Sequence, residues 1–578
     1  MAELQRAWAL GHRTEAASEA LADGLLHLYH EETRNLLGAG PIRQAAERAL
    51  RQEYLEPSLV HHRRLAEAQG RQGMHAARLA FLEGREQEAL QLNAALRRTA
   101  PWRYEAHMLD HLVQRAMADR AVNRAAYVEA AGKAWASLEQ ARAIGRSDPE
   151  VRLVEADWHL YHNRQMTYRF GEPIPDVVER GTQALDAALR LHPKSLDARL
   201  MRANFAITQA GYAVEGWCPS LCARTLLAQA EQDLDQVDAE LPDQPTALVN
   251  RAWARLILSA LSRDAEGRSL IGQAVRYADR ALHLAPRDPG AMRTRAWLAS
   301  IQAQLAFQSN QDIRPHLTKI LEIAQQTRSH WPNVEAGHCD VVEAHADAAS
   351  WAYLQRDWAG VDRAITLSLQ EGRASLTQAF SGKEAPLLRA ELVKVHRMSA
   401  AHRGLRGQSP VPDQTEADRL LQEIGPRLWG SVQVTDQLFS LRYEQAMVQL
   451  EAGRDVSASL RGLRELLDRA KAEGLSGTWL GVNWAYVHRL EALWALRRGE
   501  SPREAIRQGL ERLKPLGDGN LVQEQSAPAR AARFAFRILE APPEPQLSQA
   551  RNALAQEVQG DPILHWLLRP ELQRGGGR

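Results

Sequence analysis

The sequence predicts an all-α protein, a right-handed α-solenoid of about twelve helical hairpins with units of 44 to 50 residues. Three observations predict this fold: apolar residues recur at helical spacing, prolines recur every 44 to 49 residues, and glycines recur every 46 residues. The chain of 578 residues is 45% hydrophobic and 25% charged, which is typical of a folded chain rather than a disordered one.

Apolar residues that recur at steps of three and four predict the helices. One face of a predicted helix carries Ala274, Tyr277, Ala278, Ala281 and Leu282. No segment alternates with comparable regularity at period two, so we expect helices and no strands.

Prolines indicate where one hairpin ends and the next begins. A proline cannot continue the hydrogen-bond ladder of a helix, and it disfavours helical backbone in the residue before it. We therefore expect a turn at each member of the series. The successive intervals are 48, 44, 49, 44 and 46 residues, for Pro101, Pro149, Pro193, Pro242, Pro286 and Pro332.

Glycines predict the turns within hairpins. Gly407, Gly453 and Gly499 are 46 residues apart, and Gly40 and Gly84 are 44 apart. Gly453 and Gly499 lie in polar stretches between two helical runs. Further turn-like breaks fill the interval between these glycines, near Gly171, Gly216, Gly267, Asn310 and Asp357.

These turns divide the chain into four expected parts. Residues 1–75 form N-terminal hairpins or a cap, and residues 76–403 form the main repeat array. The Gly/Pro-rich segment 404–416 is a turn or a linker, because glycine and proline cluster there between helical runs. Residues 417–578 form C-terminal hairpins that end in a frayed tail.

The repeat texture resembles the tetratricopeptide repeat. The string Gly84-Arg-Glu-Gln-Glu-Ala89 followed by Pro101 is similar to the second half of such a unit, and Ala274, Ala281 and Pro286 match its small, small, proline spacing. The units here exceed the usual length of about 34 residues. HEAT-like repeats have a nearer period, but their signature is not evident. The resemblance implies a groove in which first-helix residues hold an extended peptide.

A second resemblance concerns the context of the array. The string Pro101-Trp102-Arg-Tyr-Glu-Ala106 is similar to regions that follow the catalytic domain in some bacterial serine/threonine kinases. This resemblance implies an association with kinase signalling. The chain itself has no Gly-rich phosphate loop, no His-Arg-Asp and no Asp-Phe-Gly, so we expect no kinase activity of its own.

Three first helices carry arginine at the same point after their prolines. The strings Arg202-Ala203-Asn204, Arg251-Ala252-Trp253 and Arg295-Ala296-Trp297 align, so the arginines are expected to form a ladder that could bind carboxylates or phosphates. The alternative is that they are solvated or pair with neighbouring Glu and Asp. The tryptophans are either an aromatic anchor or core residues. The predicted binding residues are Arg202, Arg251, Arg295, Asn204, Trp253 and Trp297.

Cysteine, histidine and acidic residues form three further candidate sites. Cys218 and Cys222 are predicted one helical turn apart at a helix start, which suits either redox sensing or ordinary structural thiols, and two ligands do not complete a zinc site. Two other groups are predicted to be ordinary helix residues rather than a metal site and a cation site. The first comprises His338, Cys339, Asp340 and His345, and the second is the helix face with Glu231, Asp235 and Asp238.

Charge and motifs exclude several classes of function. The net charge is +1, from 72 basic and 71 acidic residues, which disfavours a general nucleic-acid binder. Three cysteines indicate a reducing compartment, no secretory signal is visible, and no apolar run suits a membrane helix, so we expect a cytoplasmic protein. Local catalytic signatures are missing, so we expect no enzyme activity, cofactor or metal.

The sequence thus predicts a non-catalytic scaffold that binds a protein or peptide segment, acidic in character, in the groove of the solenoid. The alternative is the regulatory or sensor region of a bacterial serine/threonine kinase signalling system, detached from its kinase domain. A small-ligand sensor is a third hypothesis, which requires an enclosed apolar pocket. The sequence leaves the oligomeric state open.

Overall fold

The computed structural model describes residues 2–11, 13–34, 51–69, 73–121, 124–170, 174, 176–214, 222–262, 264–330, 335–380, 385–424, 432–472, 478–514, 526–540 and 545–573. All regular structure in these residues is helical. The helices are α1 (Ala2–Ala9), α2 (Glu15–Arg34), η1 (Arg51–Leu55), α4 (Glu56–Gln69), α5 (Met74–Leu82), α6 (Glu86–Thr99), α7 (Tyr104–Asp119), α8 (Arg124–Ile144), α9 (Pro149–Phe170), α10 (Val177–Leu191), α11 (Leu196–Val214), α12 (Ala223–Glu240), α13 (Pro245–Ala260), α14 (Asp264–Leu284), α15 (Pro289–Gln308), α16 (Arg314–His330), α17 (Glu335–Leu354), α18 (Trp358–Gln378), α19 (Pro386–Leu405), α20 (Val411–Ile424), α21 (Val432–Glu451), α22 (Ser457–Ala472), α23 (Thr478–Arg497), α24 (Arg503–Leu513), α25 (Ser526–Leu539), α26 (Gln546–Glu557) and α27 (Pro562–Gln573).

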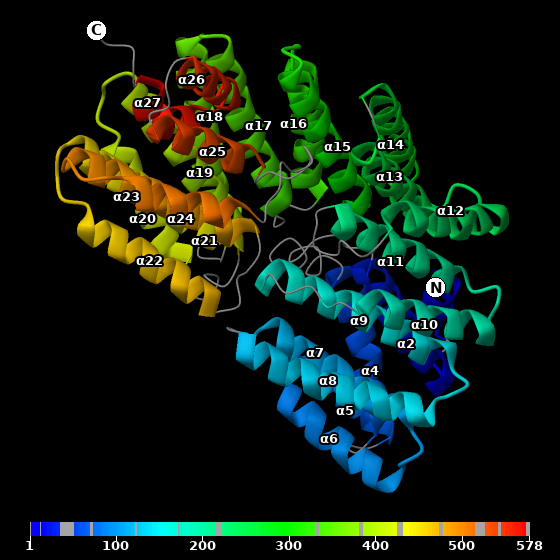
Figure 1. The fold of residues 1–578 in the computed structure, drawn as a ribbon. Helices are drawn as coiled ribbons and strands as arrows, with labels where there is room; N and C mark the ends of the chain where they lie inside the picture. Colours follow the sequence, from blue (N-terminus) through cyan, green and yellow to red (C-terminus); the bar gives the residue numbers. More distant parts are fainter. Residues whose placement is uncertain are drawn as a thin grey trace. The chain divides into compact units, whose positions relative to one another are not determined.

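Helices that follow each other in the chain pack as hairpins, and within each of the two parts of the chain described below several hairpins also contact the next one through their first helices. Pairs such as α7 with α8, α13 with α14 and α23 with α24 lie against each other (Figure 1). First helices also contact the next first helix, as α11 does α13 and α19 does α21. The prediction of an all-α solenoid built from helical hairpins is confirmed.

The turn inside several hairpins has one residue with left-handed backbone. Gly84 and Gly453 have φ of 79° and 75°, which glycine adopts without steric cost. Asn310 and Arg356 occupy the equivalent position in two other hairpins, with φ of 51° and 58°. In all four turns the next residue donates its N–H to a carbonyl five residues earlier, which satisfies an otherwise orphaned carbonyl at the helix end.

The turn between hairpins contains the periodic prolines. Pro101, Pro193, Pro242 and Pro286 lie between the end of one hairpin and the start of the next, and Pro149 opens α9. Pro332, Gly40, Gly171 and Gly216 lie outside the described residues.

The chain divides into two compact units. Unit 1 comprises residues 1–164, 174–295 and 327–334, and unit 2 comprises residues 165–173, 296–326 and 335–578. Small side chains let the helices of unit 1 approach closely, as where Ala203 and Ala206 of α11 pack in one cluster with Leu227 and Leu234 of α12.

The Gly/Pro-rich segment 404–416 lies in the middle of a hairpin. It contains the end of α19, a short turn and the start of α20. The two helices share a buried cluster in which Leu392 and Val393 meet Leu420 and Leu421. The segment is therefore a turn within one hairpin of unit 2.

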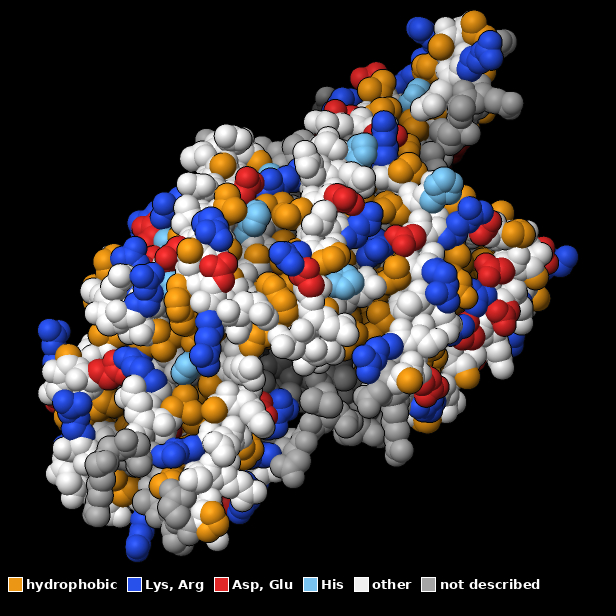
Figure 2. All heavy atoms as spheres, turned by 90° about the horizontal axis from the view of Figure 1, so that it is seen from above, with side chains coloured by type: hydrophobic (Ala, Val, Ile, Leu, Met, Phe, Trp, Pro, Cys, Tyr) orange, Lys and Arg blue, Asp and Glu red, His pale blue; other side chains and the backbone are white. Residues whose placement is uncertain are grey.

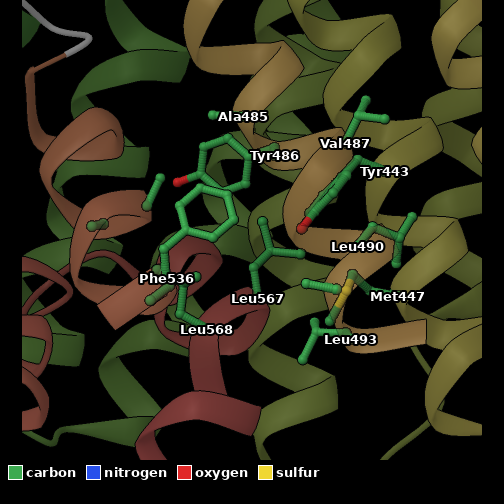
Figure 3. Close-up of a cluster of buried hydrophobic side chains, with 14 of the residues drawn as sticks. Tyr443, Met447, Ala485, Tyr486, Val487, Leu490, Leu493, Phe536, Leu567 and Leu568 are labelled. Atoms are coloured by element: carbon green, nitrogen blue, oxygen red, sulfur yellow. The ribbon is translucent and has the colours of Figure 1, made fainter. Parts of the chain in front are cut away.

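The last helix that the structure describes, α27, helps to complete the core of unit 2. Leu567 and Leu568 of α27 belong to the same buried cluster as Tyr443, Tyr486 and Phe536 (Figure 3). The helix also packs along α19. Besides α25 and α26, which precede it in the chain, α27 thus contacts the distant helix α19, and this second contact ties the late part of unit 2 to an earlier one.

A buried ion pair fixes α27. Arg489 of α23 donates to both carboxylate oxygens of Glu571 at 2.7 and 2.6 Å, and both side chains are fully buried. Arg489 also donates to Tyr443 Oη at 2.5 Å and to the Leu567 carbonyl at 2.7 Å. Because these bonds satisfy both charges, the pair is tolerated without water.

Charged side chains of both signs are interspersed on the surface. Figure 2 shows basic, acidic and hydrophobic side chains mixed over the face it draws, in agreement with a net charge of +1. Among the helices that the structure describes, none combines the length and apolarity needed to span a membrane.

Candidate functional site

The three aligned arginines occupy equivalent places in α11, α13 and α15. Each pairs with a carboxylate sixteen residues earlier, on the second helix of the preceding hairpin. The pairs are Arg202 Nη1 with Asp186 Oδ1 at 2.6 Å, Arg251 Nη2 with Asp235 Oδ1 at 2.8 Å, and Arg295 Nε with Asp279 Oδ1 at 2.6 Å. The ladder therefore exists as a series of ion pairs that join each hairpin to the next.

Additional carboxylates neutralise two of these arginines. Arg202 also binds Asp233 at 2.6 and 2.7 Å. Arg251, whose side chain is only 8% exposed, binds Glu231 at 2.6 Å and Asp238 at 2.8 Å. The acidic face considered as a cation site thus holds a guanidinium group.

The pKa values agree with firmly held guanidinium groups. Burial alone would lower the pKa of Arg251, but hydrogen bonds to Asp235 and Asp238 and the charge of Glu231 outweigh burial and raise it. The hydrogen bond to Asp233 is the main cause that raises the pKa of Arg202. Contact of the ladder with an acidic partner stays a prediction, and it requires these pairs to open.

The other predicted binding residues lie near the ladder. Trp253 is half-buried and donates Nε1–H to Thr294 Oγ1 at 3.1 Å, whereas Trp297 is 42% exposed. Asn204 is half-buried and accepts a hydrogen bond from Thr208 at 3.4 Å. Of the two tryptophans, Trp297 offers more surface to a partner.

The candidate redox and metal residues are dispersed. Cys222 is exposed just before α12, and a hydrogen bond with Thr225 is the main cause that lowers the pKa of its thiol. Cys218 lies outside the described residues. His338 is buried with its Nδ1 2.8 Å from Ser375 Oγ. Among the described residues, no cluster of three or more His, Cys, Asp or Glu side chains is arranged to hold a metal ion.

A cationic pocket lies elsewhere in unit 1, where α8, α9 and α10 meet. These helices are neighbours in Figure 1, and the pocket has a volume of about 410 Å³. Each helix contributes residues spaced along one of its faces. The lining comprises Trp135 and Arg142 of α8, Arg152, Glu155 and His159 of α9, and Arg180, Gln183, Ala184, Ala187 and Arg190 of α10. We call this the arginine pocket.

The arginine pocket has an excess of positive charge. Glu155 accepts from Arg142 at 2.7 Å and from Arg152 at 2.9 Å, so one carboxylate serves two guanidinium groups. Arg180 has a long contact of 3.4 Å with Asp176. Arg190 has no hydrogen bond or ion pair with any residue that the structure describes.

One wall of the pocket is aromatic and neutral. His159 is 7% exposed and lies 5.0 Å from Trp135 between ring centroids. Burial is the main cause that lowers the pKa of His159 to about 4. The charge of Glu155 opposes this shift, and the charges of Arg180 and Arg142 add to it. At neutral pH His159 is uncharged, so the positive charge of the pocket comes from arginine alone.

Sequence reasoning did not find the arginine pocket. Arg180, Gln183, Ala187 and Arg190 follow each other at intervals of three, four and three residues, so they lie along one face of α10. That signal is present in the sequence. The convergence of this face with those of α8 and α9 is a tertiary property, which periodicity does not contain.

The fold and these sites define a class, an α-solenoid of long helical hairpins with a cationic pocket. No family model and no curated protein matches the sequence.

Solved structures of other helical-repeat proteins are similar to the chain at low identity. The human IFIT1 dimer with PPP-AAAA is 14% identical, with 86% of this chain and 95% of that one covered and a TM-score of 0.41. Yeast Tom70 is 10% identical, with 97% and 100% covered and a TM-score of 0.34. TTC0263, a thermophilic TPR protein of Thermus thermophilus, is 14% identical, with 39% and 92% covered and a TM-score of 0.26.

Proposed function

We propose that the chain is a non-catalytic scaffold that binds an acidic segment of another protein, and that the arginine pocket anchors this segment. The observation that carries the proposal is the imbalance of charge in the pocket. Four guanidinium groups line it with a single carboxylate, Glu155. The ladder, in contrast, has a carboxylate for each of its arginines.

The chemistry of the pocket favours binding over catalysis. Arginine stays protonated at neutral pH and cannot act as a general base. Glu155 is held by two guanidinium groups. The site therefore offers fixed hydrogen-bond donors to an anion, and the rigid helices that present them keep the cost of ordering on binding small.

The size of the pocket suits part of a peptide. A volume of about 410 Å³ lies in the range of about 300–1,000 Å³ that small-ligand pockets occupy. It accepts one or two side chains of a partner while the rest of the segment runs over the helices.

A binding assay with two charge-matched variants tests the proposal. The probe is a fluorescein-labelled 12-residue peptide rich in Asp and Glu, compared with its Asn/Gln counterpart by fluorescence anisotropy on the full chain. The pocket variant is Arg180→Gln with Arg190→Gln. The control is Arg268→Gln with Arg276→Gln, two exposed arginines of α14 in the same unit.

We expect the acidic peptide to bind at least tenfold more tightly than its neutral counterpart. The pocket variant should lose at least tenfold in affinity, and the control should stay within twofold, because only the former removes charge from the site. Equal affinity of wild type and pocket variant would show that the anchor lies elsewhere.

The same assay tests the predicted contact of the ladder. Asp279→Asn removes the carboxylate that holds Arg295 at 2.6 Å. If the ladder contributes to binding, the freed guanidinium should raise the affinity for the acidic peptide. An unchanged affinity would assign the ladder to the joining of hairpins alone.

A further inference from the structure

We propose that the arginine pocket recognises a phosphoryl group, so that the partner segment is a phosphorylated one. This inference rests on the proposed function and names the chemistry of the group that the pocket holds. It follows from the charge, the unused hydrogen-bond donors and the arrangement of the lining residues.

The charge of the pocket matches a dianion better than a carboxylate. Four arginines and Glu155 leave an excess of three positive charges on the lining, or two when Asp176 beside Arg180 is included. A phosphoryl group carries close to two negative charges at neutral pH, and a carboxylate carries one. The phosphoryl group therefore compensates the pocket more completely.

The donors of the pocket also exceed what a carboxylate can accept. Each guanidinium has five N–H donors. Arg142 and Arg152 each donate one hydrogen bond to Glu155. Arg190 donates none to a residue that the structure describes. A phosphoryl group offers three acceptor oxygens. It can bind guanidinium groups from more than one wall at once.

The pocket already contains its own carboxylate. Glu155 bridges Arg142 and Arg152 and is only 7% exposed on its side chain. A single carboxylate from a partner would compete with Glu155 for these two arginines at equal charge. A dianion has the advantage in that competition, because its interaction with each guanidinium is stronger.

Small residues make room for the group between the arginines of α10. Arg180 and Arg190 are ten residues apart, a rise of about 15 Å along the helix. Ala184 and Ala187 lie between them on the same face and line the pocket. An anion over these alanines is flanked by guanidinium groups on both sides along α10, with Arg142 and Arg152 lining the rest of the pocket.

Three peptides and the two charge-matched variants test the inference on the full chain. The peptides share a neutral 12-residue background and differ at one central residue, which is phosphoserine, glutamate or serine. We expect phosphoserine to bind at least tenfold more tightly than glutamate, and serine not to bind measurably. The Arg180→Gln, Arg190→Gln variant should lose at least tenfold, and the Arg268→Gln, Arg276→Gln control should stay within twofold.

The pH dependence supplies a readout that a carboxylate would not give. The second pKa of a phosphoryl group is about 6, so binding should weaken several-fold between pH 7.5 and 5.5. His159 stays neutral in this interval because its pKa is about 4. The charged groups that face the site are Arg142 of α8, Arg152 and Glu155 of α9, and Arg180 and Arg190 of α10, with Asp176 just before α10.

The outcomes separate this inference from the proposed function. Equal affinity for the phosphoserine and glutamate peptides would overturn the phosphoryl inference and leave the acidic-segment scaffold standing. Saturable binding of inorganic phosphate, lost in the pocket variant, with no binding of any peptide would support the phosphoryl site and overturn the protein partner. Phosphopeptide binding that the pocket variant retains, or binding of a single-stranded oligonucleotide in its place, would overturn the inference. Far-UV circular dichroism confirms that each variant is folded.

Discussion

His111 of α7 should make the stability of unit 1 depend on pH, and its replacement by glutamine should remove that dependence locally. The ring is completely buried, and its Nδ1 lies 3.0 Å from the Ala134 carbonyl of α8. It meets Trp158 edge-on at 5.1 Å between ring centroids. Burial is the main cause that lowers the pKa of His111 to about 4.

The size of the effect follows from this pKa. The unfolded chain takes up the proton near pH 6.5, and the folded one only near pH 4. The stabilisation that the neutral ring provides is therefore complete above pH 6.5 and is lost as the pH falls from 6.5 towards 4. Between pH 7.5 and 5.0 the loss is about 2 kcal/mol, at about 1.4 kcal/mol for each pH unit below 6.5.

Hydrogen exchange read by mass spectrometry measures this effect at its source. Peptides from α7 and α8 report the local opening free energy at both pH values, after correction for intrinsic exchange rates. His111→Gln keeps a donor for Ala134 and has no titration. We expect the opening free energy to fall by about 2 kcal/mol more in the wild type than in the variant between pH 7.5 and 5.0.

The comparison cancels the other buried histidines. His159 and His162 also have a pKa lowered to about 4 by burial, but they titrate in both chains. Ring packing against Trp158 is lost in the variant at both pH values and cancels as well. An identical pH dependence in the two chains would refute the assignment of a buried, neutral His111.

Two further predictions concern the ladder and the hairpin turns. Arg251→Gln leaves Glu231, Asp235 and Asp238 without their shared cation. We expect the opening free energy of α12 and α13, measured by hydrogen exchange, to fall by about 2–3 kcal/mol. The control Arg268→Gln should lower it by less than about 0.5 kcal/mol. Arg356→Gly removes a non-glycine residue from left-handed backbone and should stabilise α17 and α18 by about 1 kcal/mol. Gly453→Ala should destabilise unit 2 by a similar amount. Urea unfolding measures both effects, and equal midpoints for the wild type and the two variants would contradict the role of φ at these turns.

The repeating turns could be predicted because proline and glycine act locally. Pro193 and Gly453 lie at turns of the expected kinds, since one cannot continue a helix and the other adopts positive φ freely. Asn310 and Arg356 form the same turn without glycine, where the sequence shows only a polar break. Local chemistry therefore predicts the fold class well and the individual turns less completely.

The partners of the ladder could not be predicted from periodicity. The alignment correctly placed Arg251 and Arg295 at equivalent points of α13 and α15. Their carboxylates belong to the preceding second helix, and pairing depends on how two adjacent helices face each other. The arginine pocket is a similar case, because three helix faces must converge before its charge becomes visible.

The position of α27 makes unit 2 depart from the behaviour of an open repeat array. In such an array each hairpin responds only to its neighbours, and hairpins can be lost one at a time from the ends. Here Tyr353 bonds to His565 across 212 residues, Arg569 bonds to Glu451 across 118, and Arg489 bonds to Glu571 across 82.

These contacts couple α17, α21 and α23 through one short helix. Unfolding of any of these hairpins removes part of the surface on which α27 packs. Unfolding of α27 in turn removes Glu571, the partner of the fully buried Arg489. We therefore expect unit 2 to unfold in a single cooperative transition, in which its early and late hairpins unfold together. We also expect it to fold slowly, because the contacts of α27 close long loops of chain.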